Sequence, residues 1–70
     1  MNEEELLERL AEVEHEQWMY WSKASAGEVS VECRARWSRW WIPYAELPEE
    51  EKEKDRVFAR KALAVMRATK

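Results

Sequence analysis

The chain has 70 residues, a formal net charge of −3 and a single cysteine, Cys33. A chain this short forms one domain and buries only about 60% of the surface that it exposes when unfolded. One cysteine excludes an internal disulfide and fits a reducing compartment. No apolar run approaches the ~18 residues of a membrane span, and the acidic N-terminus is the reverse of the basic start of a signal peptide. These features predict a cytoplasmic protein that makes no membrane contact.

Charge is unevenly distributed along the chain. Residues 1–16 carry seven glutamates against one arginine, whereas residues 48–70 carry seven lysines and arginines against five acidic residues. Binding to duplex nucleic acid normally requires a clear basic face, so the acidic balance makes nucleic acid a poor candidate partner. The sequence also lacks the histidine and cysteine spacing of a metal site, and no cofactor is expected.

The first expected helix begins near the N-terminus. Asn2, followed three residues later by Glu5, has the pattern of a capping box, and helical spacing continues through about Ala24. Gly27, the only glycine, is expected to end this helix. Residues 28–29 then form a short irregular or extended connection.

Two more helices are expected after this connection. Ser30 is placed to cap a second helix that runs to about Trp41, and Pro43 prevents its continuation. Pro48 suits the first position of a third helix, and residues 49–51 place three glutamates at the positive end of its dipole. Arg67 and Lys70 suit the opposite end. The sequence therefore predicts a single all-α domain of three helices over residues 1–70.

The expected inward faces follow from helical periodicity. On the first helix, Glu8 falls among the residues that face away from the apolar arc, whereas Glu14 and Gln17 fall in its middle. On the third helix, Val57 and Leu63 fall outside the expected inward stripe, which leaves apolar side chains for self-association. That inward stripe consists of Asp55, Phe58, Ala62, Val65 and Met66.

Polar residues on inward faces must find partners, because an unpaired buried carboxylate costs several kcal/mol. Glu14 is expected to meet an indole N–H, the Tyr44 hydroxyl, an arginine or a ligand. The alternatives are an internal hydrogen bond and a specificity contact in a pocket. Asp55 is expected to form a structural tie to His15, to an indole or to the loop at Pro43. His15 is interpreted as a hydrogen-bonding residue at the edge of the apolar arc.

Five tryptophans are too many to be enclosed by so short a chain. Trp18 and Trp37 are expected in the core, because burial of large aromatic side chains stabilises small folds. Other indoles should remain partly exposed, and one beside an arginine could stack on a base while the guanidinium holds a phosphate. A separate stripe of the third helix consists of three arginines. It is interpreted either as a solvated face or as a set of partners for the glutamates of the first helix. Its members are Arg56, Arg60 and Arg67.

Two motifs resemble the ryanodine-receptor repeat domain in the short form found in bacterial and bacteriophage proteins. They are residues 14–18, Glu-His-Glu-Gln-Trp, and residues 43–56, which run from Pro-Tyr-Ala-Glu-Leu-Pro to Asp-Arg. The resemblance covers roughly residues 8–66 and keeps the order of the family's motifs. It implies a small helical module that binds ligands or partners without doing chemistry, with nucleotide-derived molecules as ligands of prokaryotic members. The motif positions carried over are Glu14, His15, Trp18, Pro43, Tyr44, Leu47, Asp55 and Arg56.

The residues and the resemblance together predict a non-enzymatic module that binds a small nucleotide-derived ligand. An enzyme is disfavoured because the chain has no glycine-rich phosphate loop, metal-ligand spacing or nucleophile next to a base. The alternative is a protein-interaction module, for example a phage protein that binds a host factor, and a homodimer is compatible with both. The expected ligand contacts are Glu14, Gln17, Trp21, Arg36, Trp40, Trp41 and Tyr44. The expected structural residues are His15, Trp18, Trp37, Pro43 and Asp55.

Overall fold

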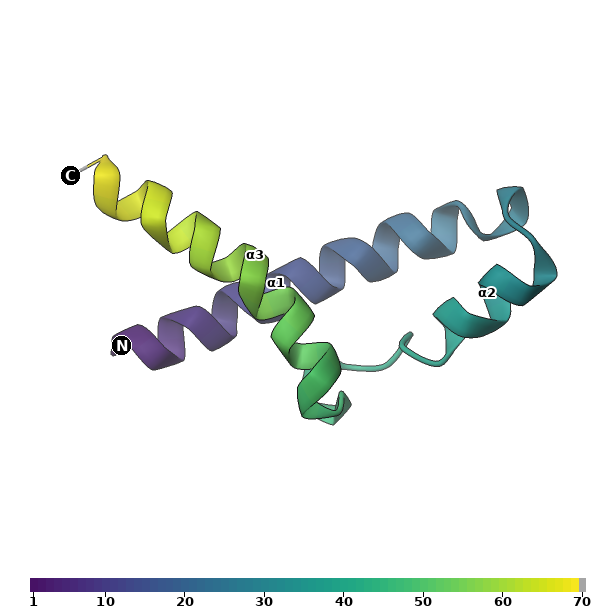
Figure 1. Ribbon diagram of the computed structural model, residues 1–70, viewed down its shortest axis with the longest axis horizontal. Helices are drawn as coiled ribbons and strands as arrows, with labels where there is room; N and C mark the ends of the chain where they lie inside the picture. The colour runs from purple at the N-terminus through teal and green to yellow at the C-terminus, as the bar shows by residue number, and fades with distance from the viewer. Residues whose placement is uncertain (70) are drawn as a thin grey trace.

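The computed structural model describes residues 1–69 and contains three α-helices joined through two single turns of 3₁₀ helix (Figure 1). Within residues 1–69 there is no β-strand, so the predicted all-α class is confirmed. No helix of this part of the chain is both long and apolar enough to cross a membrane. The elements in order are α1 (Glu3–Ala24), η1 (Ala26–Glu28), α2 (Val31–Ser38), η2 (Tyr44–Glu46) and α3 (Glu49–Ala68).

Helix α1 begins as predicted. The side chain of Asn2 accepts a hydrogen bond of 2.8 Å from the backbone N–H of Glu5, and three glutamates occupy the first turn. The helix ends at Ala24, but Gly27 does not end it. Gly27 lies within η1 and does not adopt a positive φ, so it supplies no left-handed cap. The connection is a 3₁₀ turn followed by the extended residue Val29, which agrees with the predicted irregular or extended link.

Helix α2 is shorter than predicted. Ser30 caps it by accepting a hydrogen bond of 3.1 Å from the N–H of Cys33, but the helix ends at Ser38, before Trp41. The N–H of Trp40 bonds to the carbonyl of Trp37, so the chain leaves the helix through a turn. A proline disfavours helical geometry in the residue before it, and this aromatic segment is already turning toward Pro43.

Helix α3 begins one residue later than predicted, because Pro48 is extended and occupies the position before the first helical turn. Its first turn is acidic and Arg67 lies in its last turn, as expected from the helix dipole. Lys70, which was expected at the same end, lies outside the described residues.

The core lies where α1 and α3 cross (Figure 1). Ala11 of α1 is fully buried and Ala59 of α3 is 2% exposed. Tyr44 and Leu47, from the segment around η2, complete this cluster. Small side chains at a crossing allow the two backbones to approach closely, so neither alanine can be enlarged without separating the helices.

The predicted inward face of α3 is wrong by about one residue. Ala59 and Leu63 are buried, whereas the large apolar side chains assigned to the inward stripe are mostly in solvent. Helical periodicity alone centres the inward face on the largest apolar residues. The contact between α1 and α3 instead buries the small residue Ala59. The misassigned residues, all exposed, are Phe58, Ala62, Val65 and Met66.

The crossing provides the first testable prediction. Ala59→Leu should lower the free energy of unfolding by about 1–3 kcal/mol, because the added methylene groups must push α1 and α3 apart. The matched control is Ala64→Leu at an exposed position of the same helix, which should stay within about 0.5 kcal/mol of the wild type. Urea denaturation followed by circular dichroism measures both changes. Equal stability of the two variants would contradict the role assigned to the crossing.

Candidate functional site

Two hollows flank the crossing of α1 and α3, one polar and one aromatic. The polar hollow has a volume of about 750 Å³ and lies on the side of Glu8 and Arg56. The aromatic groove has a volume of about 430 Å³ and lies on the side of Trp18 and Phe58. The two hollows differ in the chemistry of their lining residues.

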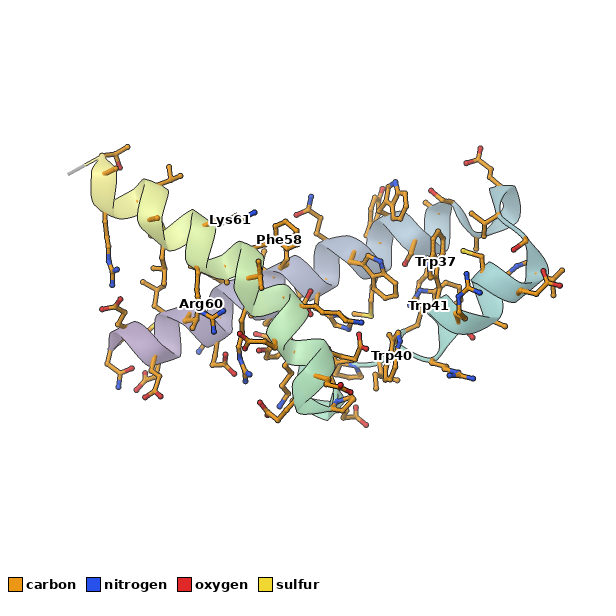
Figure 2. All side chains as sticks on the ribbon, in the orientation of Figure 1. Trp37, Trp40, Trp41, Phe58, Arg60 and Lys61 are labelled. Carbon is orange, nitrogen blue, oxygen red and sulfur yellow. The ribbon has the colours of Figure 1, made fainter. Side chains whose placement is uncertain are left out.

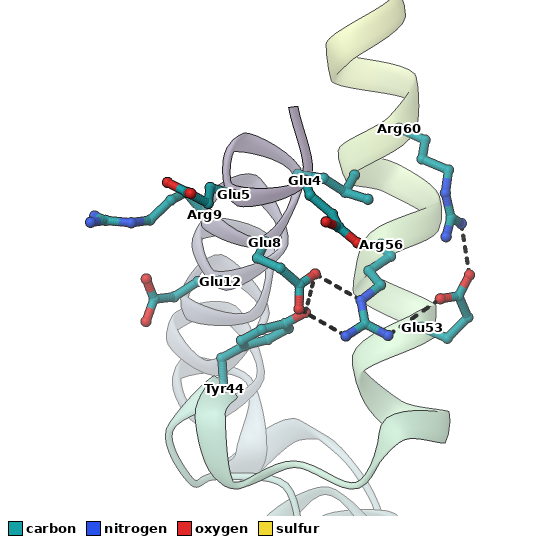
Figure 3. A pocket seen from close by; sticks show the side chains of 10 residues that line it. Glu4, Glu5, Glu8, Arg9, Glu12, Tyr44, Glu53, Arg56 and Arg60 are labelled. Atoms are coloured by element: carbon teal, nitrogen blue, oxygen red, sulfur yellow. Dashed lines mark hydrogen bonds and ion pairs between the residues drawn. The ribbon is translucent and has the colours of Figure 1, made fainter. Parts of the chain in front are cut away.

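The polar hollow is built around one ion pair (Figure 3). Arg56 donates from Nε and Nη2 to the two carboxylate oxygens of Glu8, each at 2.8 Å, and from Nη1 to Glu49 at 2.8 Å. The Tyr44 hydroxyl lies 3.2 Å from both oxygens of Glu8 and donates to that carboxylate. The bidentate pair joins α1 to α3, and Tyr44 joins the η2 segment to both. The prediction that the arginine stripe pairs with glutamates of the first helix is confirmed for Arg56 and for Arg67, which pairs with Glu3, whereas Arg60 pairs with Glu53 of its own helix.

The pKa shifts follow from these contacts. The hydrogen bonds from Arg56 lower the pKa of Glu8 below its usual 4.5. Burial raises the pKa of Tyr44 to about 12, and the adjacent Glu8 carboxylate adds to this effect. The guanidinium of Arg56 is held charged by its two carboxylate partners, which raise its pKa further. Because these groups satisfy one another, the guanidinium of Arg56 is already neutralised within the polar hollow.

His15 forms a second tie on the opposite side of the crossing. It is 3% exposed, and its Nε2 lies 2.7 Å from the carbonyl oxygen of Ile42. A carbonyl can only accept a hydrogen bond, so Nε2 carries the hydrogen. Nδ1 faces the Asp55 carboxylate at 3.5 Å. Burial raises the pKa of Asp55, and the facing His15 partly opposes this shift.

These contacts confirm the predicted structural tie between Asp55 and His15. His15 is more deeply buried than a residue at the edge of an apolar arc, and it joins α1 to both α3 and the segment before Pro43. The Trp18 ring stacks on the imidazole, with centroids 5.8 Å apart and planes 21° apart. The tie therefore also orients an indole of the aromatic groove.

The aromatic groove is lined by residues of all three helices and of the turn after α2. Its walls are Trp18, Trp37, Trp40 and Phe58, and its apolar floor includes Leu47. Its charged and titratable residues are Glu14, His15, Arg36, Glu51, Lys54 and Asp55. Figure 2 shows that three aromatic residues of the groove come from different segments: Trp37 from α2, Trp40 from the following turn and Phe58 from α3.

Four of the six charged or titratable residues of the groove are paired with one another. Lys54 bonds to Glu51 at 2.9 Å, and Asp55 faces His15. Within residues 1–69, Arg36 and Glu14 form no ion pair, and both line the groove. An acceptor and a donor therefore remain for a ligand between aromatic walls.

The groove brings together three of the seven residues predicted to contact a ligand, namely Glu14, Arg36 and Trp40. It also contains four residues that were assigned structural roles: His15, Trp18, Trp37 and Asp55. Trp18 and Trp37 are half-buried, so they are less enclosed than a core assignment requires. Phe58, Glu51 and Lys54 were missed as groove residues because the inward face of α3 was misplaced.

The other four predicted contacts, Gln17, Trp21, Trp41 and Tyr44, lie elsewhere, and Tyr44 lines the polar hollow. Gln17 is exposed, and Trp21 is 54% exposed beside Trp37. The indole N–H of Trp41 donates to the Oγ of fully buried Ser22 at 2.9 Å, a tie between the turn after α2 and α1 that no sequence signal indicated. Pro43, predicted to be structural, is extended and immediately precedes η2.

Two of the protein partners predicted for Glu14, the Tyr44 hydroxyl and an arginine, bind a different carboxylate, and the ligand alternative stays a prediction. Tyr44 and Arg56 bind Glu8, which was expected to face away from the core, and not Glu14. The sequence carries seven glutamates within residues 1–16, so the choice among them depends on the crossing geometry. Residues 1–69 contain no group of three or more His, Cys, Asp and Glu placed to hold a metal ion.

The Glu8–Arg56 pair predicts a pH-dependent contribution to stability. Because the pKa of Glu8 is lowered in the folded state, the pair stabilises above pH 4.5, and this stabilisation is lost as the pH falls through the lowered value. Glu8→Gln should therefore cost about 1 kcal/mol at neutral pH, a value reduced for the partial exposure of this carboxylate. The cost should shrink toward zero in strong acid.

Denaturation of the wild type and Glu8→Gln across this pH range tests the prediction. Glu12→Gln is the matched control, since Glu12 lies one turn later in the same hollow and should show no such pH dependence relative to the wild type. A Glu8→Gln difference that stays constant down to strong acid would refute the assignment.

No protein-family model, curated protein or solved structure matches this chain. The resemblance to the ryanodine-receptor repeat therefore rests on the motif residues themselves.

Proposed function

We propose that this chain is a non-enzymatic binding module, similar to the short ryanodine-receptor repeat, that holds a small nucleotide-derived ligand in the aromatic groove. The observation that carries the proposal is the pairing of aromatic walls with two uncommitted opposite charges, Arg36 and Glu14. A groove of about 430 Å³ falls in the range of about 300–1,000 Å³ typical of small-molecule sites.

Each wall of the groove has a role in this proposal. Stacking of a base on an indole contributes about 1–3 kcal/mol to binding, largely independent of which base is bound. Trp37 and Trp40 come from α2 and the turn after it, whereas Phe58 comes from α3. A flat ligand that enters between them would contact segments on both sides of the groove.

The uncommitted charges supply orientation and specificity. A guanidinium binds phosphate through parallel N–H donors, so Arg36 is assigned to a phosphate at the groove rim. A carboxylate only accepts hydrogen bonds, so Glu14 is assigned to an N–H-bearing edge of the base. The ligand class favoured by this pair is a purine or similar heterocycle with few phosphates.

The larger polar hollow is disfavoured as the ligand site. Arg56 is already neutralised by Glu8 and Glu49, and Arg60 is paired with Glu53 at 2.7 Å. Five glutamates line this hollow against three arginines, and such a surplus of negative charge repels a phosphate. The two titratable pairs at the crossing, Glu8–Arg56 and His15–Asp55, join α1 to α3, and this structural role favours binding over catalysis.

A nucleotide panel that includes cyclic dinucleotides and ADP-ribose derivatives tests the proposal. At least one member should raise the melting temperature and change tryptophan fluorescence. Arg36→Ala should then weaken that ligand about 10-fold or more, the loss expected for a charged hydrogen bond. Arg34→Ala is the matched control, since Arg34 lies on the same helix but lines a different hollow.

Two results would overturn the proposal. One is a panel in which no compound changes either signal. The other is equal binding by the Arg36→Ala and Arg34→Ala variants, which have the same net charge and differ only in position on α2.

A protein partner is the second candidate, favoured by exposed aromatic side chains at the end of α1. Tyr20 is 80% exposed and Trp21 is 54% exposed, and such residues are frequent anchors of protein interfaces. A phage protein that occupies a host factor would use them in this way. Recovery of one host protein by the wild type but not by Tyr20→Ser/Trp21→Ser, with no nucleotide response, would favour this alternative.

A further inference from the structure

The dipeptide Arg-Trp occurs twice, three residues apart, at the end of α2. Its first copy is Arg36-Trp37 and its second copy is Arg39-Trp40. The first copy lies within α2, and Arg39 caps the C-terminal end of the helix with a helical backbone, at φ −59° and ψ −29°. Residues three apart on a helix are neighbours on its surface, with Cβ atoms about 5–6 Å apart. The two guanidinium groups therefore start from adjacent positions.

The indoles of both copies are held by the rest of the chain. The ring centroid of Trp37 lies 6.5 Å from that of Trp18 and 5.4 Å from that of Trp21. Trp40 packs against the core cluster, and both indoles line the aromatic groove, where Figure 2 labels them. The backbone that carries the two arginines is thus positioned before any ligand binds, which lowers the entropic cost of binding.

The two arginines have no acidic partner within the chain. Arg36 and Arg39 are exposed, and within residues 1–69 neither forms an ion pair. Residues 33–45 contain three arginines and no acid, and Glu32, one turn before Arg36, forms no ion pair with it. Like charges at neighbouring helical positions repel each other. An anion that contacts both guanidinium groups would remove this repulsion.

We infer that Arg36 and Arg39 form a site for two linked phosphate groups, so that the ligand of the aromatic groove carries two phosphates and not one. The inference rests on the proposed function, because the base must occupy the groove for its phosphates to reach both residues. A guanidinium binds a phosphate through two parallel N–H donors. Arg36 lines the groove and takes the phosphate nearer to the base, whereas Arg39 takes the second.

Two kinds of nucleotide supply two linked phosphates. In a nucleoside diphosphate the phosphates are joined directly, and in a dinucleotide a sugar with a second base separates them. Trp40 follows Arg39 in the same dipeptide, so a second base could stack on this indole. The third arginine, Arg34, does not belong to the site, because it lines a separate hollow with Trp41.

Isothermal titration with the mono- and diphosphates of adenosine and guanosine tests the inference. With at least one base, the wild type should bind the diphosphate about 10-fold more tightly than the monophosphate, the gain expected for one further charge-assisted contact. Arg39→Ala should abolish this preference without changing the affinity for the monophosphate, whereas Arg36→Ala should weaken both. Arg34→Ala, the matched control, removes the same charge and should keep the preference.

A charge-conserving variant and a dinucleotide sharpen the test. Arg39→Lys should recover only part of the preference, because an ammonium cannot form the two parallel bonds. A linear diadenylate that carries two phosphates separates the two sources. Tighter binding of the diadenylate or of the diphosphate supports the site and identifies its source, provided that Arg39→Ala removes the gain. All substituted side chains are exposed, so the variants should keep the circular dichroism spectrum of the wild type.

Three results would overturn the inference. Equal affinity for mono- and diphosphates, with binding that still depends on Arg36, would remove the two-phosphate site and leave the proposed function intact. Equal loss of the preference in Arg34→Ala and Arg39→Ala would reduce it to a general effect of charge. Absence of binding by every probe would overturn the proposed function together with this inference.

Discussion

The close crossing of α1 and α3 is the constraint on which the rest of this structure depends. The chain has only five buried apolar residues within the part that the structure describes, and two of them are the alanines Ala11 and Ala59. Alanines contribute little apolar area, so their value lies in the short distance that they allow between helix backbones. That distance determines which side chains of the two helices can reach one another. The Glu8–Arg56 pair on one side and the His15–Asp55 contact on the other are both consequences of it.

These two polar ties also position the segment between α2 and α3. Tyr44 is bound through its hydroxyl to Glu8, and the carbonyl of Ile42 is bound to His15. Both ends of a short irregular stretch are therefore held against α1, and the Trp41–Ser22 bond holds the residue before it. Trp40 is consequently directed toward the crossing, where it packs on the core cluster. The aromatic groove is formed by contacts among helices that are few but directional.

Local signals were sufficient to predict the helices but not the contacts between them. The caps at Asn2 and Ser30, together with the break at Pro43, follow from chemistry within four residues, and the structure agrees with them. The face of α3 could not be obtained in this way, because periodicity favours Phe58 and the crossing instead requires Ala59. The same limit applies to the site. His15 was one of three partners predicted for Asp55, since a buried acid needs a partner, whereas the choice of Glu8 over Glu14 depends on tertiary geometry.

Because the core is small, the tryptophans lie at its edge and are not enclosed within it. Within residues 1–69, no tryptophan is fully buried, although an indole stabilises a fold most when it is enclosed. The exposed part of each indole is apolar area that stays in contact with solvent after folding. Anything that covers it and binds only the folded chain stabilises the fold by mass action. In a chain with so few buried apolar residues, such stabilisation by a bound partner is large relative to the free energy of unfolding of the chain alone. Binding of a partner and folding are therefore expected to be energetically linked.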